Sequence, residues 1–292
     1  MVIILGASGY IGSQFVNELR NKDVGFLPLS RFEVDYYDSD ILTDLIKETK
    51  ARFLINCAGF TGKPNVDVCE DHQEETWEAN AVLPQTLARV CESLNLPWGH
   101  VSSGCIYDGD NGGIGFSEDD APNLTFELDN CSFYSGSKVC GEENIKNVGG
   151  KCYIWRLRIP FDQYDSPRNY LSKLMNYEKL LSATNSISHR ADFVKACLQL
   201  WLRNSEYGTY NVVNRGPITT ESVAARIKDW YKIKGIDKEF EFFSDDNEFY
   251  SKAAKAKRSN CVLDNRKLLA AGVDIRTADE AILDSLNNWK TS

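Results

Sequence analysis

Tyr134 and Lys138 are four residues apart in a segment whose apolar pattern predicts a helix over residues 133–145. At this spacing the two side chains lie on the same face of the helix. A free phenol titrates near pH ~10, and a neighbouring ammonium group favours the ionised form and so lowers the pKa of the phenol. The pair is suited to give a proton to an oxygen atom on which negative charge develops, as it does when a hydride reduces a ketone.

Ser103 and Cys105 follow a predicted strand at residues 100–102. In an extended segment their side chains point to the same side, about 6–7 Å apart along the chain, so Cys105 would share any pocket that Ser103 lines. A lone cysteine is most often a small buried hydrophobic residue. These two residues alone therefore leave both a catalytic and a purely structural role open for Cys105.

A turn with the spacing Gly-x-x-Gly-x-x-Gly follows the first predicted strand, residues 2–5, and opens a predicted helix over residues 11–19. Such a turn lets backbone amides and the amino terminus of the helix approach a pyrophosphate. We therefore expect a dinucleotide cofactor to contact the residues of this turn, namely Gly6, Ser8, Gly9, Tyr10, Ile11 and Gly12.

Two further segments indicate how the dinucleotide would be held. Arg31 ends the second predicted strand, at a place where enzymes for NAD usually carry an acidic residue that binds the ribose 2′-hydroxyl. An arginine suits a 2′-phosphate, but Glu33 lies nearby, so the sequence favours NADP(H) over NAD(H) without excluding NAD(H). Small residues end the third predicted strand and would let the backbone lie close to the adenosine half: Cys57, Ala58 and Gly59.

The elements that must position these residues alternate along the first half of the chain. Short apolar runs predict strands at residues 2–5, 25–29, 53–55, 100–102 and 153–157. Amphipathic stretches between them predict helices at residues 11–19, 41–47, 74–94 and 133–145. Alternation of this kind produces right-handed crossovers and a parallel sheet with helices on both faces. We therefore expect residues 1–160 to form a Rossmann-type doubly wound α/β domain that binds the cofactor and carries the Tyr/Lys helix.

The second half of the chain is less regular. It shows helical patterns at residues 170–181, 221–233 and 278–289 and a strand pattern at residues 210–213. We expect residues 161–292 to form mainly a smaller substrate-binding lobe, with some of its segments free to return to the first domain.

Composition narrows the classes of function. The 292 residues carry 33 basic and 42 acidic side chains, a net charge of −9 that disfavours binding to nucleic acid or to an anionic membrane. The nine cysteines are scattered and form no Cys-x-x-Cys pair, and the three histidines show no metal-ligand spacing, so we expect neither a disulfide framework nor a metal site. The first residues form an apolar run without a basic leader, and no run of about 18 apolar residues follows, so we expect a cytoplasmic protein.

Taken with the glycine-rich turn, Ser103, Tyr134 and Lys138 resemble the Ser/Thr-Tyr-Lys active site of the short-chain dehydrogenase/reductase superfamily. In that superfamily the tyrosine donates the proton, the hydroxyl gives a second hydrogen bond to the same oxygen, and the lysine tunes the phenol and binds the cofactor ribose.

Over nearly its whole length the chain resembles the extended reductases of the dTDP-4-dehydrorhamnose reductase group. Within that group it is similar to bifunctional UDP-4-keto-6-deoxyglucose 3,5-epimerases/4-reductases, as found in the carboxy-terminal part of plant rhamnose synthases. The Gly-Lys-Pro-Asn-Val-Asp motif at residues 62–67 and the Pro-Arg-Asn motif at residues 167–169 are specific to this subgroup. Further matching segments are residues 104–106, 113–116, 177–179, 258–260 and 263–264.

The resemblance implies one pocket for two reactions on a 4-keto sugar nucleotide, epimerisation at C3 and C5 and then reduction at C4. It assigns the proton acceptor and donor of the epimerisation to Cys105 and Lys173, and it assigns substrate contacts to Thr61, Cys105, Asn169 and Arg258, the last at the phosphates. Uridine as the base rests on the resemblance alone. Many relatives dimerise through the helices that flank the sheet, so a homodimer is allowed as well.

Two alternatives remain open from the sequence. The chain could be a 4-ketoreductase alone, with epimerisation left to a separate enzyme, although Cys105 and the Pro-Arg-Asn motif count against this. It could also be a regulatory subunit that binds NADP without catalysis, since some relatives in that class retain the Tyr-x-x-x-Lys motif. An epimerisation pair made of Cys105 and Lys173 would have no use in such a subunit.

Overall fold

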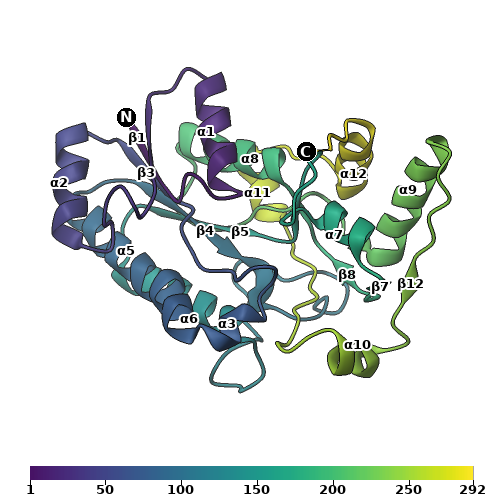
Figure 1. Ribbon diagram of the computed structural model, residues 1–292. Helices are drawn as coiled ribbons and strands as arrows, with labels where there is room; N and C mark the ends of the chain where they lie inside the picture. The colour runs from purple at the N-terminus through teal and green to yellow at the C-terminus, as the bar shows by residue number, and fades with distance from the viewer. Residues whose placement is uncertain (292) are drawn as a thin grey trace.

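The central element of the fold is a six-stranded sheet, shown in the computed structural model of Figure 1, which describes residues 1–291. All neighbouring strands in it are parallel. Their order is β2 (Phe26–Leu29), β1 (Val2–Leu5), β3 (Phe53–Asn56), β4 (Trp98–Ser103), β5 (Cys152–Leu157) and β10 (Gly208–Asn211). The predicted α/β fold with a parallel sheet is therefore confirmed.

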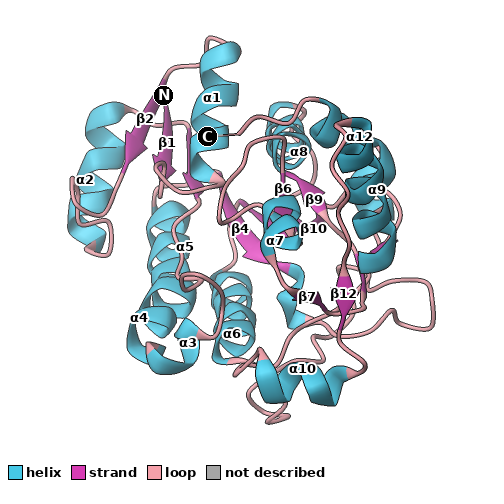
Figure 2. Ribbon diagram, turned by 45° about the vertical axis from the view of Figure 1, so that its right-hand side comes forward, coloured by secondary structure: helices cyan, strands magenta, loops and turns pink. Residues whose placement is uncertain are grey.

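Helices cover both faces of this sheet, so the strands β1, β3 and β4 are buried at every position. On one face, α1 (Gly12–Asn21) and α8 (Arg190–Leu202) bury Phe15 and Phe193 against Val2 and Ile4. On the other face lie α2 (Ser39–Thr49), α5 (Leu83–Ser93) and α6 (Phe133–Val148), whose apolar side chains pack on Ile3 and Leu54. Figures 1 and 2 show this three-layer arrangement.

The order of the strands places a crevice at the carboxyl edge of the sheet. From β1 the chain first moves to β2 on one side, and β3 then returns to the other side of β1. Ligands of open α/β sheets bind where the order reverses in this way. The glycine-rich turn after β1 and the segment after β3 both start from this point.

The predicted helix at residues 74–94 is interrupted in the structure. It consists of α4 (Gln73–Trp77), a π-helical turn η1 (Glu78–Val82) and then α5, preceded by the short helix α3 (Val68–Asp71). Within the π turn, Asn80 is fully buried, accepts a hydrogen bond from the Phe60 backbone N–H (3.0 Å) and donates one to the Phe60 carbonyl (2.8 Å). The turn thereby holds the backbone of the segment that follows β3.

A smaller lobe lies beside the carboxyl edge of the sheet (Figure 2). Its core packs α7 (Tyr170–Asn176), α9 (Thr220–Ile233) and α12 (Ala278–Asn287) around Leu171, Val223 and Ile282. Short strand pairs complete it: β6 (Pro160–Phe161) with β9 (Ser188–His189), β7 (Lys179–Leu180) with β12 (Glu241–Phe242), and β8 (Thr184–Asn185) with β11 (Ile218–Thr219). The helix α10 (Asp246–Lys252) flanks these elements, whereas α11 (Arg266–Ala270) packs on the main sheet at β10.

Three expectations for the second half need correction or refinement. The helix predicted over residues 170–181 ends at Asn176, because residues 179–180 form strand β7 instead. The strand predicted at residues 210–213 lies at residues 208–211. Helix α8 and strand β10 pack on and extend the main sheet, so residues 190–211 belong with the first domain rather than with the lobe.

Residues 1–291 contain neither a candidate membrane span nor a candidate metal site. No helix there is long and apolar enough to span a membrane. No group of three or more His, Cys, Asp or Glu side chains in that range is arranged to hold a metal ion. The nine cysteines are all free thiols.

Candidate active site

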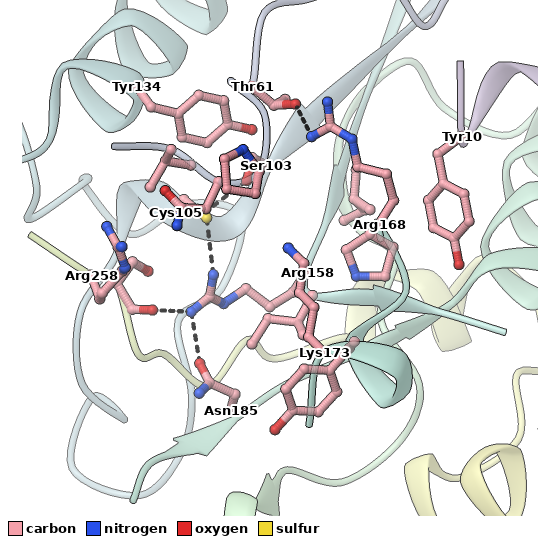
Figure 3. Close-up of a pocket in the computed structure, with 18 of the residues that line it drawn as sticks. Tyr10, Thr61, Ser103, Cys105, Tyr134, Arg158, Arg168, Lys173, Asn185 and Arg258 are labelled. Atoms are coloured by element: carbon pink, nitrogen blue, oxygen red, sulfur yellow. Dashed lines mark hydrogen bonds between the residues drawn. The ribbon is translucent and has the colours of Figure 1, made fainter. Parts of the chain in front are cut away.

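A cleft of about 1500 Å³ lies between the carboxyl edge of the sheet and the smaller lobe. Its walls come from the turns after β1, β3 and β4, the first turns of α6, the helix α7, and the segment at residues 252–260. Figure 3 shows the part of the cleft that contains Ser103, Cys105, Tyr134 and Lys173.

The glycine-rich turn forms one end of the cleft. Gly6 has φ +69°, and a Cβ on it would lie 2.7 Å from the Ala58 backbone nitrogen. A Cβ on Gly12 would lie 2.2 Å from the Gly6 carbonyl oxygen. Only glycine fits at these two positions, which shape the turn while the cleft itself is lined by Ser8, Gly9, Tyr10 and Ile11. An exposed turn at the start of α1 is a suitable cradle for a pyrophosphate.

The segment after β3 forms the adjoining wall, lined by Cys57, Ala58 and Gly59. It is fixed from below by Asn56, whose Oδ1 accepts from the Ala58 N–H (3.0 Å) and whose Nδ2 donates to Nδ1 of His100 (3.0 Å). Burial lowers the pKa of His100 to about 3, so this histidine is a neutral structural support. The small side chains leave the backbone of this wall accessible from the cleft.

Arg31 is exposed just after β2 and lies outside the lined cleft, with its guanidinium 5.3 Å from the centre of the Phe32 ring. The nearby Glu33 uses one carboxylate oxygen to accept from the Ser30 N–H (2.8 Å) and hydroxyl (2.7 Å). That oxygen is committed to the turn, whereas the guanidinium of Arg31 is free of any ion pair among residues 1–291.

Tyr134 and Lys138 are both buried on one face of α6, which begins at the N-cap Ser132. Burial raises the pKa of Tyr134 far above its ordinary value, negative charge at Cys105 adds to the rise, and a hydrogen bond with Ser103 acts against it. The expectation that Lys138 brings the pKa of this phenol toward working pH is therefore wrong for the structure. Tyr134 is held in its protonated form, the form that a proton donor requires.

Lys138 is supported by a buried ion pair one helical turn further along. Burial lowers the pKa of Lys138 to about 8, and the carboxylate of Glu142 acts against this shift. Burial alone would raise the pKa of Glu142, but Arg156 outweighs it and holds that pKa at about 2. Glu142 accepts from Arg156 Nη2 (2.7 Å) and from the hydroxyl of Ser102 (2.6 Å), which joins α6 to β4 and β5 beneath the cleft.

Ser103 and Cys105 both line the cleft, but the segment that carries them is not extended throughout as the sequence suggested. Strand β4 ends at Ser103, and a 3₁₀ turn, η2 (Gly104–Ile106), follows. The Ser103 hydroxyl caps this turn by accepting from the Cys105 N–H (3.1 Å). The turn keeps the hydroxyl and the thiol on the cleft wall near Tyr134 (Figure 3).

Arg158 is a site residue that the sequence analysis missed. It follows β5, is 4% exposed and lines the cleft, and its Nη1 donates to Cys105 Sγ at 2.9 Å (Figure 3). A usable signal was present, because Arg156 interrupts an otherwise apolar strand and Arg158 follows its last residue, and charged residues at such buried positions must find partners.

Three cations from the lobe side line the same cleft: Arg168, Lys173 and Arg258. Arg168 Nη1 donates to the Thr61 hydroxyl (2.8 Å), a contact between the lobe and the segment after β3. Burial lowers the pKa of Lys173, and the charges of Arg168 and Arg258 lower it further. Arg258 donates from both Nη atoms to the carboxylate of Asp67, each at 2.7 Å.

Asn169 does not contact the cleft, so its assignment to the substrate is corrected. It is fully buried, and its Oδ1 accepts from the Leu171 N–H (2.9 Å) as the N-cap of α7. Its Nδ2 donates to the carbonyls of Asp162 and Tyr164, both at 2.7 Å. The neighbouring Arg168 is the residue of this motif whose charged group faces the cleft.

Comparisons with known proteins agree on one family. The sequence model of the RmlD substrate binding domain matches residues 1–291. The chain is 33% identical over 244 residues to a bifunctional dTDP-4-dehydrorhamnose 3,5-epimerase/dTDP-4-dehydrorhamnose reductase from Arabidopsis thaliana, covering 82% of this chain and 77% of that protein. It is 30% identical over 288 residues to a trifunctional UDP-glucose 4,6-dehydratase/UDP-4-keto-6-deoxy-D-glucose 3,5-epimerase/UDP-4-keto-L-rhamnose-reductase from the same plant, covering 96% of this chain but 41% of that protein.

Solved structures share the fold over nearly the whole chain. A UDP-rhamnose synthase from Acanthamoeba polyphaga mimivirus superposes with a TM-score of 0.88 at 23% identity and 98% coverage of each chain. A dTDP-4-dehydrorhamnose reductase from Bacillus anthracis, solved in complex with NADP, superposes with a TM-score of 0.81 at 21% identity, covering 99% of this chain and 97% of that one. At these identities the two structures bear on the fold alone.

Proposed function

The chain belongs to the RmlD substrate binding domain family, as the sequence resemblance predicted, and we propose that it is a bifunctional 3,5-epimerase/4-reductase. It would convert UDP-4-keto-6-deoxy-D-glucose to UDP-L-rhamnose with NADPH. Reduction of a 4-keto sugar nucleotide is an activity that the two Arabidopsis relatives and a dTDP-4-dehydrorhamnose reductase from Mycobacterium tuberculosis share by name. The single observation that carries the proposal is the convergence of Tyr134, Ser103, Cys105 and Lys173 on one cleft.

The residues at the glycine-rich turn fit a dinucleotide cofactor. Glycines at positions 6 and 12 let the turn approach a pyrophosphate, and Ser8, Gly9, Tyr10 and Ile11 would hold it. Cys57, Ala58 and Gly59 would lie along the adenosine half. The exposed guanidinium of Arg31, beside a Glu33 that is turned to Ser30, supports NADPH over NADH.

In the reduction, bound NADPH would supply a hydride to C4 of the sugar. Tyr134 would donate its phenolic proton to the C4 oxygen, and Ser103 would give a second hydrogen bond to the same oxygen. The Lys138 ammonium would stabilise the phenolate that remains and hold a ribose hydroxyl. This division of roles agrees with the structure, in which burial keeps Tyr134 protonated while Lys138, with a pKa of about 8, carries a proton at neutral pH.

In the epimerisation, the protons at C3 and C5 are acidic because they lie next to the C4 ketone. Tyr134 and Ser103 would stabilise the resulting enolate with the same hydrogen bonds that serve the reduction. Inversion needs a proton acceptor on one face of the ring and a donor on the other. Cys105, from the turn after β4, and Lys173, from α7 in the lobe, come from different walls of the cleft and would fill these two roles.

The substrate's diphosphate would be met by the cations of the lobe. Arg258 lies at the cleft, although its two Nη atoms are paired with Asp67. A phosphate can accept hydrogen bonds from both Nη atoms of Arg258 only if Arg258 leaves Asp67 or donates to both anions. The Thr61 hydroxyl, which accepts a hydrogen bond from Arg168, lies on the opposite wall.

The proposal is tested by following NADPH oxidation with two substrates, UDP-4-keto-6-deoxyglucose and its dTDP counterpart, and by identifying the products. We expect turnover with the uridine compound and UDP-L-rhamnose as its product. A product reduced at C4 without inversion would indicate a 4-ketoreductase alone. NADPH binding without turnover of either compound would contradict the proposal.

A further inference from the structure

Arg158 differs from the other buried arginines in having no acidic partner. Arg156 is paired with Glu142 at 2.7 Å and Arg190 with Asp162 at 2.7 Å. Among the ion pairs of residues 1–291, none includes Arg158, although its side chain is buried as deeply as theirs. Burying a charge without a counter-ion costs free energy, so we expect the counter-ion of Arg158 to be one of the groups that its guanidinium contacts.

The contacts of Arg158 leave one such group. Nη2 donates to Asn185 Oδ1 (2.7 Å) and to the carbonyl of Ser259, and both acceptors are neutral. Nη1 donates to Cys105 Sγ at 2.9 Å. Among the described residues, the sulfur is the only hydrogen-bond partner of the guanidinium that can become an anion by losing a proton.

The guanidinium is held against the sulfur from behind. Asn185 is 5% exposed and its Oδ1 also accepts from the Cys261 N–H (2.9 Å), which fixes the orientation of its amide. A Cβ on Gly104 would come 2.6 Å from Leu263 and 3.4 Å from Arg158 Cδ, so the glycine before Cys105 permits the close approach. The arginine is thus positioned by the lobe and aimed at the thiol.

We propose that Arg158 is the counter-ion of a Cys105 thiolate, the form in which this cysteine can take the proton in the proposed epimerisation. The inference rests on the proposed function for its chemical role, but the ion pair itself does not. A cation in contact with sulfur favours the thiolate, the nucleophilic and basic form of cysteine. Arg158 contacts a reacting atom and would therefore be a catalytic residue.

Each inversion moves one proton from carbon to the Cys105 sulfur and another from the Lys173 nitrogen to carbon. The Cys105 thiolate takes the proton from the carbon next to the ketone, and the electron pair of that C–H bond moves to the ketone oxygen, held by Tyr134 and Ser103. The carbon then takes a proton from the Lys173 ammonium on the other face, and the ketone forms again. A thiol and a neutral amine remain, and exchange with water in the open cleft restores the thiolate and the ammonium.

Alkylation of Cys105 by iodoacetamide, followed by mass spectrometry of its peptide, tests the ion pair without any sugar substrate. At pH 7 we expect Arg158→Gln to slow the alkylation by about tenfold or more, because the thiolate is the reactive form and loss of the adjacent cation disfavours it. Arg158→Lys, which keeps the charge, should retain most of the rate. At pH 10 the rates of the variants should converge, because a free cysteine thiol is largely ionised at that pH.

Other charged or titratable groups around Cys105 are unchanged in these variants: Tyr134 and Lys138 from α6, and Cys261 from the lobe. The half-buried Cys131 and Cys140 provide internal references in the same digest, and their rates should not change. Because Arg158→Gln could disturb the fold, Asn185→Asp is the second variant. It places a carboxylate against Arg158 Nη2 and should slow Cys105 as well.

Equal Cys105 rates at pH 7 in the wild-type chain, Arg158→Gln and Asn185→Asp would overturn the ion pair. If Arg158→Gln loses its fold, an unchanged rate in Asn185→Asp alone overturns it. Deuterium exchange at C3 and C5 of UDP-4-keto-6-deoxyglucose is measured separately. Slower alkylation in the variants with no exchange in the wild-type chain would uphold the ion pair and reject the epimerase, so the two failures are distinguishable.

Discussion

Lys138 lies directly against Gly59: a Cβ on this glycine would come 3.5 Å from Lys138 Nζ and 3.1 Å from Asn80 Oδ1. The lysine of α6 therefore rests on the backbone of the wall that follows β3. A Cβ at position 59 would contact the ammonium at an ordinary van der Waals distance and would require the Asn80 amide to shift by a few tenths of an ångström. The group proposed to stabilise the phenolate is thus placed at the wall where the cofactor would lie.

The charge of Lys138 predicts the alkaline limb of the pH profile. Burial lowers the pKa of this ammonium to about 8, so its proton is lost as the pH rises through 8. Because the proposed mechanism needs the cation, kcat/KM for NADPH, which reports the free enzyme, should fall about tenfold per unit above that value. A steady-state pH profile of kcat/KM between pH 6 and pH 10 checks this prediction. A flat profile up to pH 10 would mean that the cation is not required.

Replacement of Tyr134 by phenylalanine should remove the reduction. The variant keeps the ring and loses only the proton donor, a role worth about 100- to 10,000-fold in rate. Affinity for NADPH, measured by fluorescence titration, should stay near the wild-type value because the turn and the Lys138 ammonium are intact. Full reductase turnover in Tyr134→Phe would show that another group supplies the proton.

Replacement of Cys105 by serine should remove the epimerisation. A hydroxyl of similar size is a far weaker acid than a thiol, so it offers no anion to take the C3 and C5 protons, and exchange should fall by about 100-fold or more. NADPH affinity should be retained. Cys131→Ser, at another half-buried cysteine, is the matched control and should exchange normally. Normal exchange in Cys105→Ser as well would show that this thiol only packs the wall.

Arg31→Ala tests the preference for NADPH. Loss of a charge-assisted contact with the 2′-phosphate, about 1.5–3 kcal/mol, should weaken NADPH binding by about tenfold or more and leave NADH binding unchanged. Arg52 is also exposed, but it lies just before β3, at the amino edge of the sheet and away from the cleft. Arg52→Ala therefore controls for the loss of charge. Equal weakening for both cofactors, or none, would remove Arg31 from the phosphate site.

The first half of the fold could be predicted from the sequence because its signals are local. The run at Val2–Leu5 is buried at every position, and the glycines at 6 and 12 are required by contacts within a few residues of the turn or with the adjacent strand end. Parallel order then follows from the alternation of strands and helices. Ser103 and Tyr134 could be placed at the site for the same reason, since both stand at the ends of such elements.

The features that could not be predicted depend on distant partners. The helix α7 ends at Asn176 because Lys179 and Leu180 pair with Glu241 and Phe242, far along the chain. The π turn around Asn80 forms where its amide binds both backbone groups of Phe60. No local pattern in residues 74–94 carries this information.

The errors at the site have the same origin. Asn169 was assigned to the substrate through a family motif, although an asparagine just before a helix is a favoured N-cap, which is what the structure shows. Arg158 was passed over because its contacts, Cys105, Asn185 and Ser259, come from three separate segments. The local signal is limited to one arginine inside an otherwise apolar strand, Arg156, and a second, Arg158, directly after it.

In the proposed function, one chain both inverts and reduces a 4-keto sugar nucleotide. NMR analysis of the product formed from UDP-4-keto-6-deoxyglucose and NADPH in deuterated water tests both reactions at once. We expect UDP-L-rhamnose that carries deuterium at both C3 and C5. A reduced sugar without deuterium at these carbons would contradict the proposed function and would leave the chain as a 4-ketoreductase.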